Sequence, residues 1–326
     1  MARLTIVQAL NQTLRYLLAT DQRVILLGED VGRDGGVFRV TEGLVDEFGP
    51  DRVVDTPLAE SAIIGTSVGL AASGLRPIPE IQFFGFLLPA FEQLVTQAAR
   101  LHARSAGRHN IAMVVRTPYG GGVRTPELHS DAFESYFVHA PGLKVVAVST
   151  PYNAKGLLLS AYDDPDPVLF LEPLRTYRAM REEVPDEPYR VPLGQARVAR
   201  PGRDVTLVAW SGMVPVVERA AELLAEQDGV EAEVIDLQTL SPLDEATLVA
   251  SVQKTGRAVV VHEAVRTGGL GAEIAALIME RGFLSLEAPV MRVTSPDVPY
   301  PPTGLEGFFL PDAERVVEAV RASLRY

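Results

Sequence analysis

The stretch TIVQALNQTLRYLLATDQRVILL, residues 5–27, decides the fold. Over residues 5–20 its apolar residues recur every three or four positions, which is the pattern of one buried helix face, and Thr5 is a suitable N-cap. The residues from Val24 to Leu27 form a continuous apolar run, typical of a strand that is buried on both faces. The stretch therefore predicts a helix that leads into a strand of a parallel sheet.

The same alternation of helix-like and strand-like segments continues along the chain. Further strand-like apolar runs are Arg52 to Val54, Ile78 to Phe84, Ile111 to Val115, Lys144 to Val148 and Val168 to Leu171. Helix-like stretches such as Leu87 to Arg104 and Asn153 to Tyr162 separate them. Apolar strands with helices between them predict an α/β fold, in which a mostly parallel sheet is flanked by helices on both faces.

A polar stretch predicts a domain boundary. Residues 184–204 hold four prolines, and the alternation stops there. It resumes with strand-like runs at 205–210, 233–237, 258–262 and 290–293, and with helix-like stretches at 215–226, 243–252, 272–281 and 313–324. We therefore predict two α/β domains, over residues 1–190 and 191–326.

Composition excludes several classes of protein. The 326 residues carry a formal net charge of −12, which would repel nucleic acid or an anionic membrane. The absence of Cys excludes a disulfide framework, a thiolate zinc site, an iron–sulfur cluster and a Cys nucleophile. No run approaches the ~20 apolar residues of a membrane span, and the first residues lack the apolar block of a signal peptide. We expect a cytoplasmic protein with no membrane or nucleic-acid partner.

The segment from Asp55 to Glu60 is the first candidate site. A predicted strand ends at Asp55, Pro57 suits a first helical turn, and Glu60 begins the next helix-like run. Open α/β sheets place their ligands beyond the carboxyl ends of parallel strands. Glu60 therefore either complements the positive end of its helix or faces a ligand.

The next run contains a formal match to the nucleophile elbow of serine hydrolases. Gly65 to Gly69 reads G-x-S-x-G, with Ser67 as the nucleophile. An elbow needs a full strand before its first glycine, and only Ile63 and Ile64 are available. The small residues of the run favour a helix that packs closely against a neighbour, so a serine hydrolase is the weaker alternative.

Two further residues lie at predicted strand ends. Phe86 follows Gly85 and is either a core residue or one wall of a pocket for a flat heterocycle. The glycines 120–122 form a loop after the strand at Val115, and His129 opens the next helical stretch as either a structural or a functional residue. No P-loop, G-x-G-x-x-G or Gly-Asp-Gly signature is present, so a phosphorylated cofactor would be gripped elsewhere.

Taken together, six segments resemble the beta subunits of the decarboxylating component of 2-oxo acid dehydrogenases. They are Leu27–Gly32, Gly35–Phe38, Asp55–Glu60, Glu80–Phe86, Gly120–Asp131 and Pro141–Val146. The resemblance extends from Thr5 to the C-terminus. Phe86 and the run Leu128-His129-Ser130 are similar to bacterial forms that act on pyruvate, whereas branched-chain forms have a Tyr and a His-His-Ser run there. Acetoin forms share much of the pattern.

The resemblance implies a fold, a cofactor and partners. Residues 1–190 would form a transketolase-like, pyrimidine-binding domain and residues 191–326 a transketolase-like C-terminal assembly domain. Members of the family are α2β2 tetramers that share thiamine diphosphate across the α/β interface, with the alpha subunit holding the diphosphate through Mg²⁺. The acetyl group passes to the lipoyl domain of a dihydrolipoyl acyltransferase. The basic subunit-binding domain of that acyltransferase would dock on the C-terminal domain, which is acidic because it contains 12 basic and 19 acidic residues. A non-catalytic scaffold subunit is the contrasting hypothesis.

The resemblance also implies residue roles. Glu60 matches the glutamate that hydrogen-bonds a pyrimidine ring nitrogen, Phe86 matches the aromatic residue that packs on that ring, and Leu58 should lie nearby. His129 matches a histidine that assists transfer to the lipoyl group. Glu29 and Glu92 align with acidic residues that could relay protons between active sites. A K⁺ site in some relatives would correspond here to Met113, Ala161, Tyr162, Asp164 and Asp166.

Overall fold

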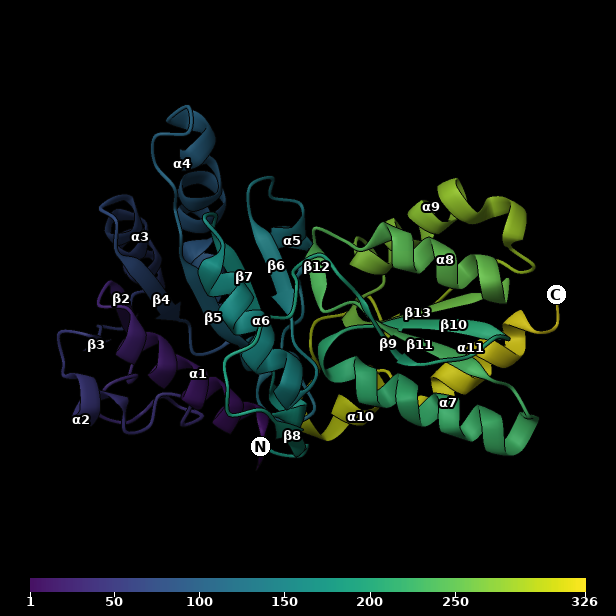
Figure 1. Cartoon of the computed structure of the whole chain (residues 1–326). Helices are drawn as coiled ribbons and strands as arrows, with labels where there is room; N and C mark the ends of the chain where they lie inside the picture. The colour runs from purple at the N-terminus through teal and green to yellow at the C-terminus, as the bar shows by residue number, and fades with distance from the viewer. The chain divides into compact units, whose positions relative to one another are not determined.

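The computed structural model describes all residues 1–326, which pack into two compact units (Figure 1). The N-terminal unit comprises residues 1–119 and 136–193, and the C-terminal unit comprises residues 120–135 and 194–326. The division after residue 193 lies close to the predicted boundary. The segment 120–135, which the sequence assigned to the first domain, packs with the C-terminal unit because its backbone is hydrogen-bonded to Glu263 and Glu306.

The N-terminal unit is built on a parallel sheet. Its strands follow the order β6-β7-β5-β4-β2-β3, and neighbouring strands among them are parallel, as predicted. The strands are β2 (Val24–Gly28), β3 (Val53–Asp55), β4 (Arg76–Glu80), β5 (Val114–Tyr119), β6 (Lys144–Ala147) and β7 (Val168–Pro173). The predicted strand over residues 78–84 is shorter, because the chain turns into a helical segment at Phe84.

The longer helices of the N-terminal unit begin at side chains that cap them. Thr5 and Gln8 form a capping box at α1 (Ile6–Thr20), as do Thr150 and Asn153 at α6 (Pro151–Asp163). The buried faces of α1 and α6 pack together in the core over the sheet. The other segments are α2 (Leu44–Phe48), α3 (Glu60–Ala72), α4 (Ala99–Arg104), α5 (Ser135–Val138), η4 (Leu174–Thr176), and the antiparallel pair β1 (Ala2–Leu4) and β8 (Glu182–Val184).

The predicted helix over residues 87–104 is not a single α-helix. It consists of the 3-10 segment η1 (Phe84–Ala90), the π segment η2 (Glu92–Ala98) and the short α4. Pro89 lies inside η1, where it lacks the N–H that a regular helix needs. The predicted helix-like stretch is therefore helical, but its type changes along the chain.

The C-terminal unit has a second, smaller sheet. Its order is β14-β13-β10-β11-β9, with β9 as an antiparallel edge strand. The strands are β9 (Arg197–Arg200), β10 (Val205–Ala209), β11 (Ala232–Asp236), β13 (Ala258–Val265) and β14 (Met291–Ser295). The short strand β12 (Thr239–Ser241) is not part of this sheet. The helical segments are η3 (Glu127–His129), η5 (Ser211–Met213), α7 (Val214–Asp228), α8 (Glu245–Thr255), α9 (Leu270–Gly282), η6 (Phe283–Ser285), η7 (Thr303–Leu305), α10 (Glu306–Phe309) and α11 (Ala313–Ser323).

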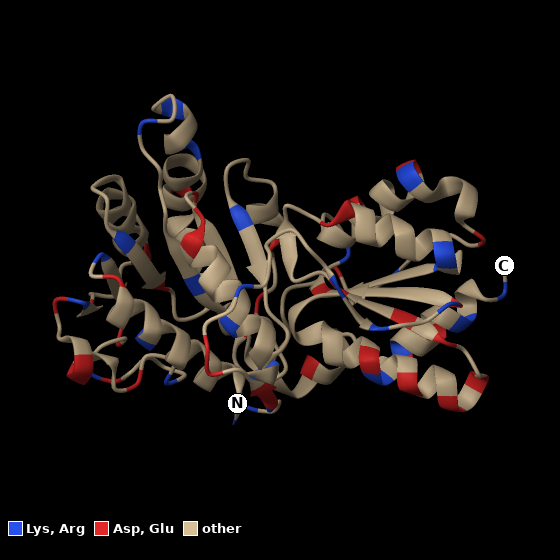
Figure 2. Ribbon diagram, viewed as in Figure 1, with Lys and Arg blue, Asp and Glu red and all other residues tan.

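Helices cover both faces of this second sheet. Helices α7 and α11 pack on one face, and α8 and α9 pack together on the other (Figure 1). Glu218, Glu222 and Glu226 recur every four residues along α7, and Figure 2 shows this acidic stripe on the helix. The predicted α/β layout is confirmed.

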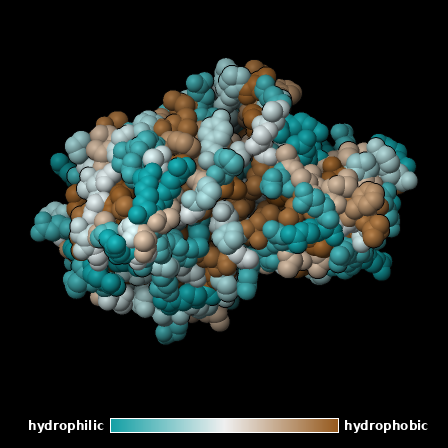
Figure 3. Space-filling view, turned by 90° about the horizontal axis from the view of Figure 1, so that it is seen from above, coloured by the Kyte–Doolittle hydropathy of each residue, from teal (hydrophilic) through white to brown (hydrophobic).

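The surface shows hydrophobic residues interspersed with hydrophilic ones (Figure 3). None of the helices reaches the length and apolar character that crossing a membrane requires. Leu58, Leu284 and Phe308 are among the most exposed large hydrophobic side chains. Single exposed residues of this kind are ordinary on proteins, and Leu58 differs from the others in lying two residues before Glu60.

Candidate functional site

The carboxyl ends of three neighbouring strands carry most of the predicted site residues. Gly28 at the end of β2 lies in register with Asp55 at the end of β3 and with Glu80 at the end of β4. Thr56 N–H donates to the Gly28 carbonyl over 2.9 Å, which holds the first two ends together. We call the residues that follow these ends, Glu29, 56–60 and 81–86, the sheet edge. Such an edge is the usual ligand position in a parallel sheet.

Glu60 is the first residue of α3, and its side chain is half-buried. Its carboxylate forms neither a hydrogen bond nor an ion pair within the chain, and no side chain caps the helix. Glu29 is close enough to feel its charge, because burial, Asp30 and Glu60 together raise the pKa of the Glu29 carboxyl. The structure therefore brings these two carboxyl groups together, and that of Glu60 is free to bond to another molecule.

Phe86 is held at the sheet edge by a row of aromatic rings. Its ring meets Phe83 edge-to-face at 5.7 Å between centroids, Phe83 meets Phe38 at 5.4 Å, and Phe38 meets Tyr177 at 5.4 Å. Phe86 is a half-buried member of this row. Since the inner rings fix its position, Phe86 can offer part of its ring to a flat partner.

A hydrogen bond ties the segments that carry Glu60 and Phe86. Ser61 Oγ, at the start of α3, donates to the carbonyl of Pro89 in η1. A little further along α3, a Cβ on Gly65 would lie 3.1 Å from the side-chain oxygen of Gln93 in η2, so the two segments approach closely. Gly65 thus serves close packing, as the sequence predicted, whereas a Cβ on Gly69 would meet open space.

The serine hydrolase alternative is excluded by the position of Ser67. This residue lies inside α3 and is fully buried, and its hydroxyl donates to the Ile63 carbonyl over 2.8 Å. A nucleophile elbow places its serine at an exposed turn between a strand and a helix. The G-x-S-x-G match is therefore part of a packed helix.

A buried charge network joins β4, β5 and β7, and the sequence analysis missed it. Arg116 donates to both carboxylate oxygens of Glu172 over 2.7 and 3.0 Å and to Glu80 over 2.9 Å, and all three residues are buried. Burial raises the pKa of the Glu80 carboxyl even though Arg116 opposes this shift. Glu80 ends β4, whereas Arg116 and Glu172 lie inside β5 and β7, and a charged residue beside an apolar run was the available sequence signal.

His129 lies in the C-terminal unit, at the end of η3. Its side chain is half-buried, and its carbonyl accepts a hydrogen bond from Thr125 Oγ1 over 3.4 Å. The next residue, Ser130, is buried and shares a 2.6 Å hydrogen bond with the Thr125 hydroxyl. Burial, with help from Glu127, raises the pKa of the Asp131 carboxyl to about 6, which makes it a further ionisable group that the sequence analysis did not single out.

The other predicted residues already have partners. Glu92 is exposed and accepts hydrogen bonds from the amides of Gln93 over 2.6 Å and Gln97 over 2.7 Å. Asp164 accepts from Lys144 over 2.7 Å, and Asp166 pairs with the same ammonium at 3.4 Å. No group of three or more His, Asp or Glu side chains is arranged to hold a metal ion.

Backbone oxygens offer a better fit to K⁺ than these carboxylates. Ala161 and Tyr162 lie in the last turn of α6, where carbonyl oxygens have no partner within the helix. The negative end of the helix dipole favours a cation there. The Met113 carbonyl accepts one hydrogen bond, from Val168 N–H over 3.0 Å, and keeps a second lone pair.

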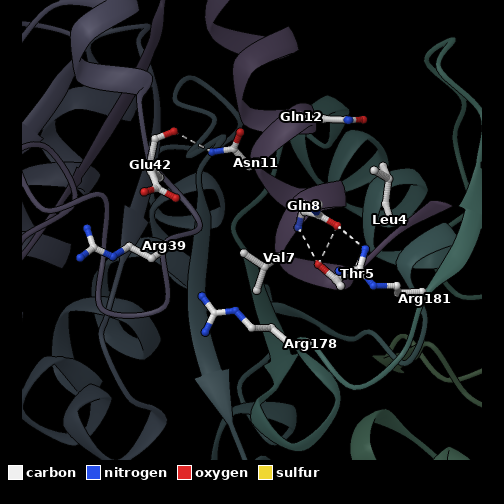
Figure 4. Close-up of a pocket in the computed structure, with 10 residues that line it drawn as sticks. All are labelled: Leu4, Thr5, Val7, Gln8, Asn11, Gln12, Arg39, Glu42, Arg178 and Arg181. Atoms are coloured by element: carbon white, nitrogen blue, oxygen red, sulfur yellow. Dashed lines mark hydrogen bonds between the residues drawn. The ribbon is translucent and has the colours of Figure 1, made fainter. Parts of the chain in front are cut away.

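Two pockets adjoin the first helices of the N-terminal unit. A polar pocket of about 400 Å³ lies at the start of α1 and includes Arg39, Arg178 and Arg181; none of the predicted site residues lines it (Figure 4). An apolar pocket of about 300 Å³ is lined by Pro57, Ala59 and other residues around the start of α3. The second pocket lies between α3 and strands β2 and β3, and neither Glu60 nor Phe86 lines it.

Comparisons with known proteins agree on both units. Residues 2–180 match the family model of the transketolase pyrimidine binding domain, and residues 194–316 match that of the transketolase C-terminal domain. The chain is 52% identical to the pyruvate dehydrogenase E1 component subunit beta of Staphylococcus epidermidis, and 50% identical to the protein of the same name from Bacillus subtilis, over the full length of each. A solved split gene transketolase, described as an inactive beta4 tetramer, has the same fold, with a TM-score of 0.81 and 24% identity over 99% of both chains.

Proposed function

The chain belongs to the family of pyruvate dehydrogenase E1 component beta subunits, and on that basis we propose that it contributes half of a thiamine diphosphate site, with Glu60 as its central group. Its function is the thiamine diphosphate-dependent oxidative decarboxylation of pyruvate. The observation that carries the assignment of Glu60 is a half-buried carboxylate without a bonding partner at the carboxyl edge of a parallel sheet.

Glu60 would bind the aminopyrimidine of the cofactor. A carboxyl group at this place can hold a proton against a ring nitrogen, and Glu29, whose pKa is raised, can pass a proton to it. When bound, thiamine diphosphate supplies the acidic carbon and the electron sink that loss of CO₂ from a 2-oxo acid requires. Phe86 would pack on the pyrimidine face, and the exposed Leu58 would lie nearby.

We assign the second half-reaction to His129. In this proposal the imidazole donates a proton to the lipoyl sulfur that departs when the acetyl group is transferred, and it orients the substrate carboxylate. The fixed position of Ser130 and the neighbouring Asp131, whose pKa of about 6 lies in the working range, support this role.

The partners follow from the family. We propose that an alpha subunit completes an α2β2 tetramer and holds the diphosphate through Mg²⁺, since the donor groups of this chain include no side-chain cluster suited to a metal. The acidic stripe of α7 favours docking of the basic subunit-binding domain of an acyltransferase. We further propose a cytoplasmic location and a role for Glu92 in proton relay. A K⁺ site would lie at the carbonyls of Met113, Ala161 and Tyr162, with Asp164 and Asp166 beside it.

The test is Glu60→Gln in the tetramer with the alpha partner. We expect assembly to persist and pyruvate decarboxylation, followed with an artificial electron acceptor, to fall at least about 100-fold, since a proton-transfer group contributes about 10² to 10⁴. Glu187→Gln, at an exposed position, is the matched control and should be fully active. Normal turnover by the Glu60 variant contradicts the assignment. If the alpha partner alone already decarboxylates pyruvate, the chain is a scaffold instead.

A further inference from the structure

The loop of residues 120–124, which we call the glycine loop, has little conformational preference of its own. It reads Gly-Gly-Gly-Val-Arg and connects the end of β5 to η3, which carries His129. Gly120 and Gly122 adopt φ of 79° and 93°, and Arg124 adopts a φ of 62°. Glycines reach such angles easily but leave many others open, so other groups must select this path.

Two buried carboxylates hold the glycine loop in this conformation. Glu306, the first residue of α10, accepts with one oxygen from Gly122 N–H over 3.0 Å and from Arg124 N–H over 3.1 Å. Glu263, in β13, accepts from Gly121 N–H over 2.8 Å. Both carboxylates are buried, and a charge in such a place is costly unless it is bonded. The backbone of the loop supplies these bonds.

Tyr300 belongs to the same network. Its hydroxyl donates over 2.7 Å to the same Glu306 oxygen that accepts from the loop. A Cβ on Gly121 would collide with the Tyr300 hydroxyl, so the loop passes closely over this ring. The path from Gly121 to Arg124 is thus fixed, and a hydrogen bond between the hydroxyls of Thr125 and Ser130 closes the turn that carries His129.

We propose that Glu306 and Tyr300 are positioning residues that set the place of His129 during acetyl transfer. The proposal rests on the function assigned to His129 above. Glu306 fixes the start of the segment through two N–H groups, and the Tyr300 hydroxyl holds in place the Glu306 oxygen that accepts from them. Neither residue needs to touch the substrate. Loosening either anchor should therefore reduce the step that uses His129 more than the step that uses Glu60.

Tyr300→Phe is the cleanest test, because it keeps the ring that packs against Phe309 at 4.9 Å and removes only the hydroxyl. In the assembled tetramer we expect acetylation of a free lipoyl domain to fall about tenfold in kcat, with decarboxylation by an artificial acceptor within about twofold of normal. Tyr326→Phe, at an exposed tyrosine, is the matched control. Equal losses in the two assays, or no loss in either, overturn the proposal.

A double-mutant cycle with His129→Ala shows whether Tyr300 acts through His129 or contributes to acetyl transfer independently of it. If Tyr300 acts through His129, Tyr300→Phe should cost nothing further in a His129→Ala background. Equal costs in both backgrounds overturn the proposal while leaving the role of His129 intact. Normal acetylation by His129→Ala overturns the proposed function of that residue, and the positioning proposal with it.

Glu306 provides an independent arm of the test. Glu306→Gln keeps an acceptor oxygen for the loop, so it should retain more acetylation than Glu306→Ala. Hydrogen exchange of the amides in residues 120–130 should be fastest in the Ala variant, intermediate in the Gln variant and unchanged elsewhere in the chain. Slow exchange of these amides in both variants shows that Glu306 does not hold the loop, and overturns the proposal.

Discussion

Glu60 in the N-terminal unit and Glu306 in the C-terminal unit each begin a helix, but their carboxylates are used in opposite ways. That of Glu60 is half-buried and bonds to nothing in the chain, whereas that of Glu306 is buried and accepts three hydrogen bonds. A carboxylate with all its bonds made within the chain stabilises the fold. One without them contributes little to the fold and is available to a ligand, which is the property expected of a functional site.

The largest effect on stability is expected where a bonded charge is most buried. Arg116 is 1% exposed and bonded to Glu80 and Glu172. Arg116→Met leaves two buried carboxylates without a cation, which should lower the free energy of unfolding by about 3 to 5 kcal/mol. Urea denaturation measures this loss, with Arg108→Met at an exposed position as the control. A loss below about 1 kcal/mol would mean that bonded charge in this chain does not stabilise the fold.

The second effect concerns pH and the core of the C-terminal unit. His262 is fully buried in β13 and stacks on Trp210 at 5.3 Å between ring centroids. Burial, with Arg292 and Arg266, lowers the pKa of this histidine to about 4, against 6.5 in the unfolded chain. The unfolded state therefore binds the proton more readily, so stability is kept above pH 6.5 and lost as the pH falls towards 4.

The size of this loss follows from the two pKa values. Between pH 7 and pH 5 the histidine should reduce the free energy of unfolding by about 2 kcal/mol, and the loss should level off below pH 4. Urea denaturation at a series of pH values in the wild type and in His262→Gln measures it. The variant is expected to be less stable than the wild type at pH 7, but its free energy of unfolding should fall less as the pH is lowered. If the free energies of unfolding of the two proteins change with pH in parallel, the prediction is contradicted.

A direct comparison of the two glutamates comes third. Glu306→Gln removes the charge from three hydrogen bonds and should lower the free energy of unfolding by about 1.5 kcal/mol, whereas Glu60→Gln should change it by less than about 0.5 kcal/mol. Denaturant midpoints of both variants against the wild type provide the measurement. If both substitutions destabilise equally, the contrast between the two carboxylates does not hold.

The fold was largely predictable because its signals are local. Apolar runs such as Val24 to Leu27 and Val168 to Leu171 are confirmed as strands of one parallel sheet, with helices between the strands along the chain. The errors arose where a single residue overrides the pattern, as Pro89 does in the predicted helix over residues 87–104. Such a residue changes the type of helix without changing the apolar spacing.

The site was predictable only in part, for the same reason. Glu60 could be singled out because its strand, turn and helix are adjacent in the sequence. The anchors of the glycine loop could not, since Glu263 and Glu306 lie 142 and 184 residues from the amides that they bind. The one available signal was a charged residue within an apolar run, as at His262 and Glu263 in β13.

The smallest effect on stability should come from the hydrogen bond that joins the start of α3 to η1. Ser61 Oγ donates to the Pro89 carbonyl, and Ser61→Ala should cost about 0.5 to 1 kcal/mol of stability. Because α3 carries Glu60 and η1 carries Phe86, the same change should weaken thiamine diphosphate binding several-fold while leaving kcat at saturating cofactor nearly unchanged. Isothermal titration of the tetramer measures the affinity, with Ser73→Ala, whose hydroxyl bonds only within α3, as the control. If both variants bind the cofactor equally well, the position of Glu60 does not depend on η1, and helix α3 alone orients that carboxylate.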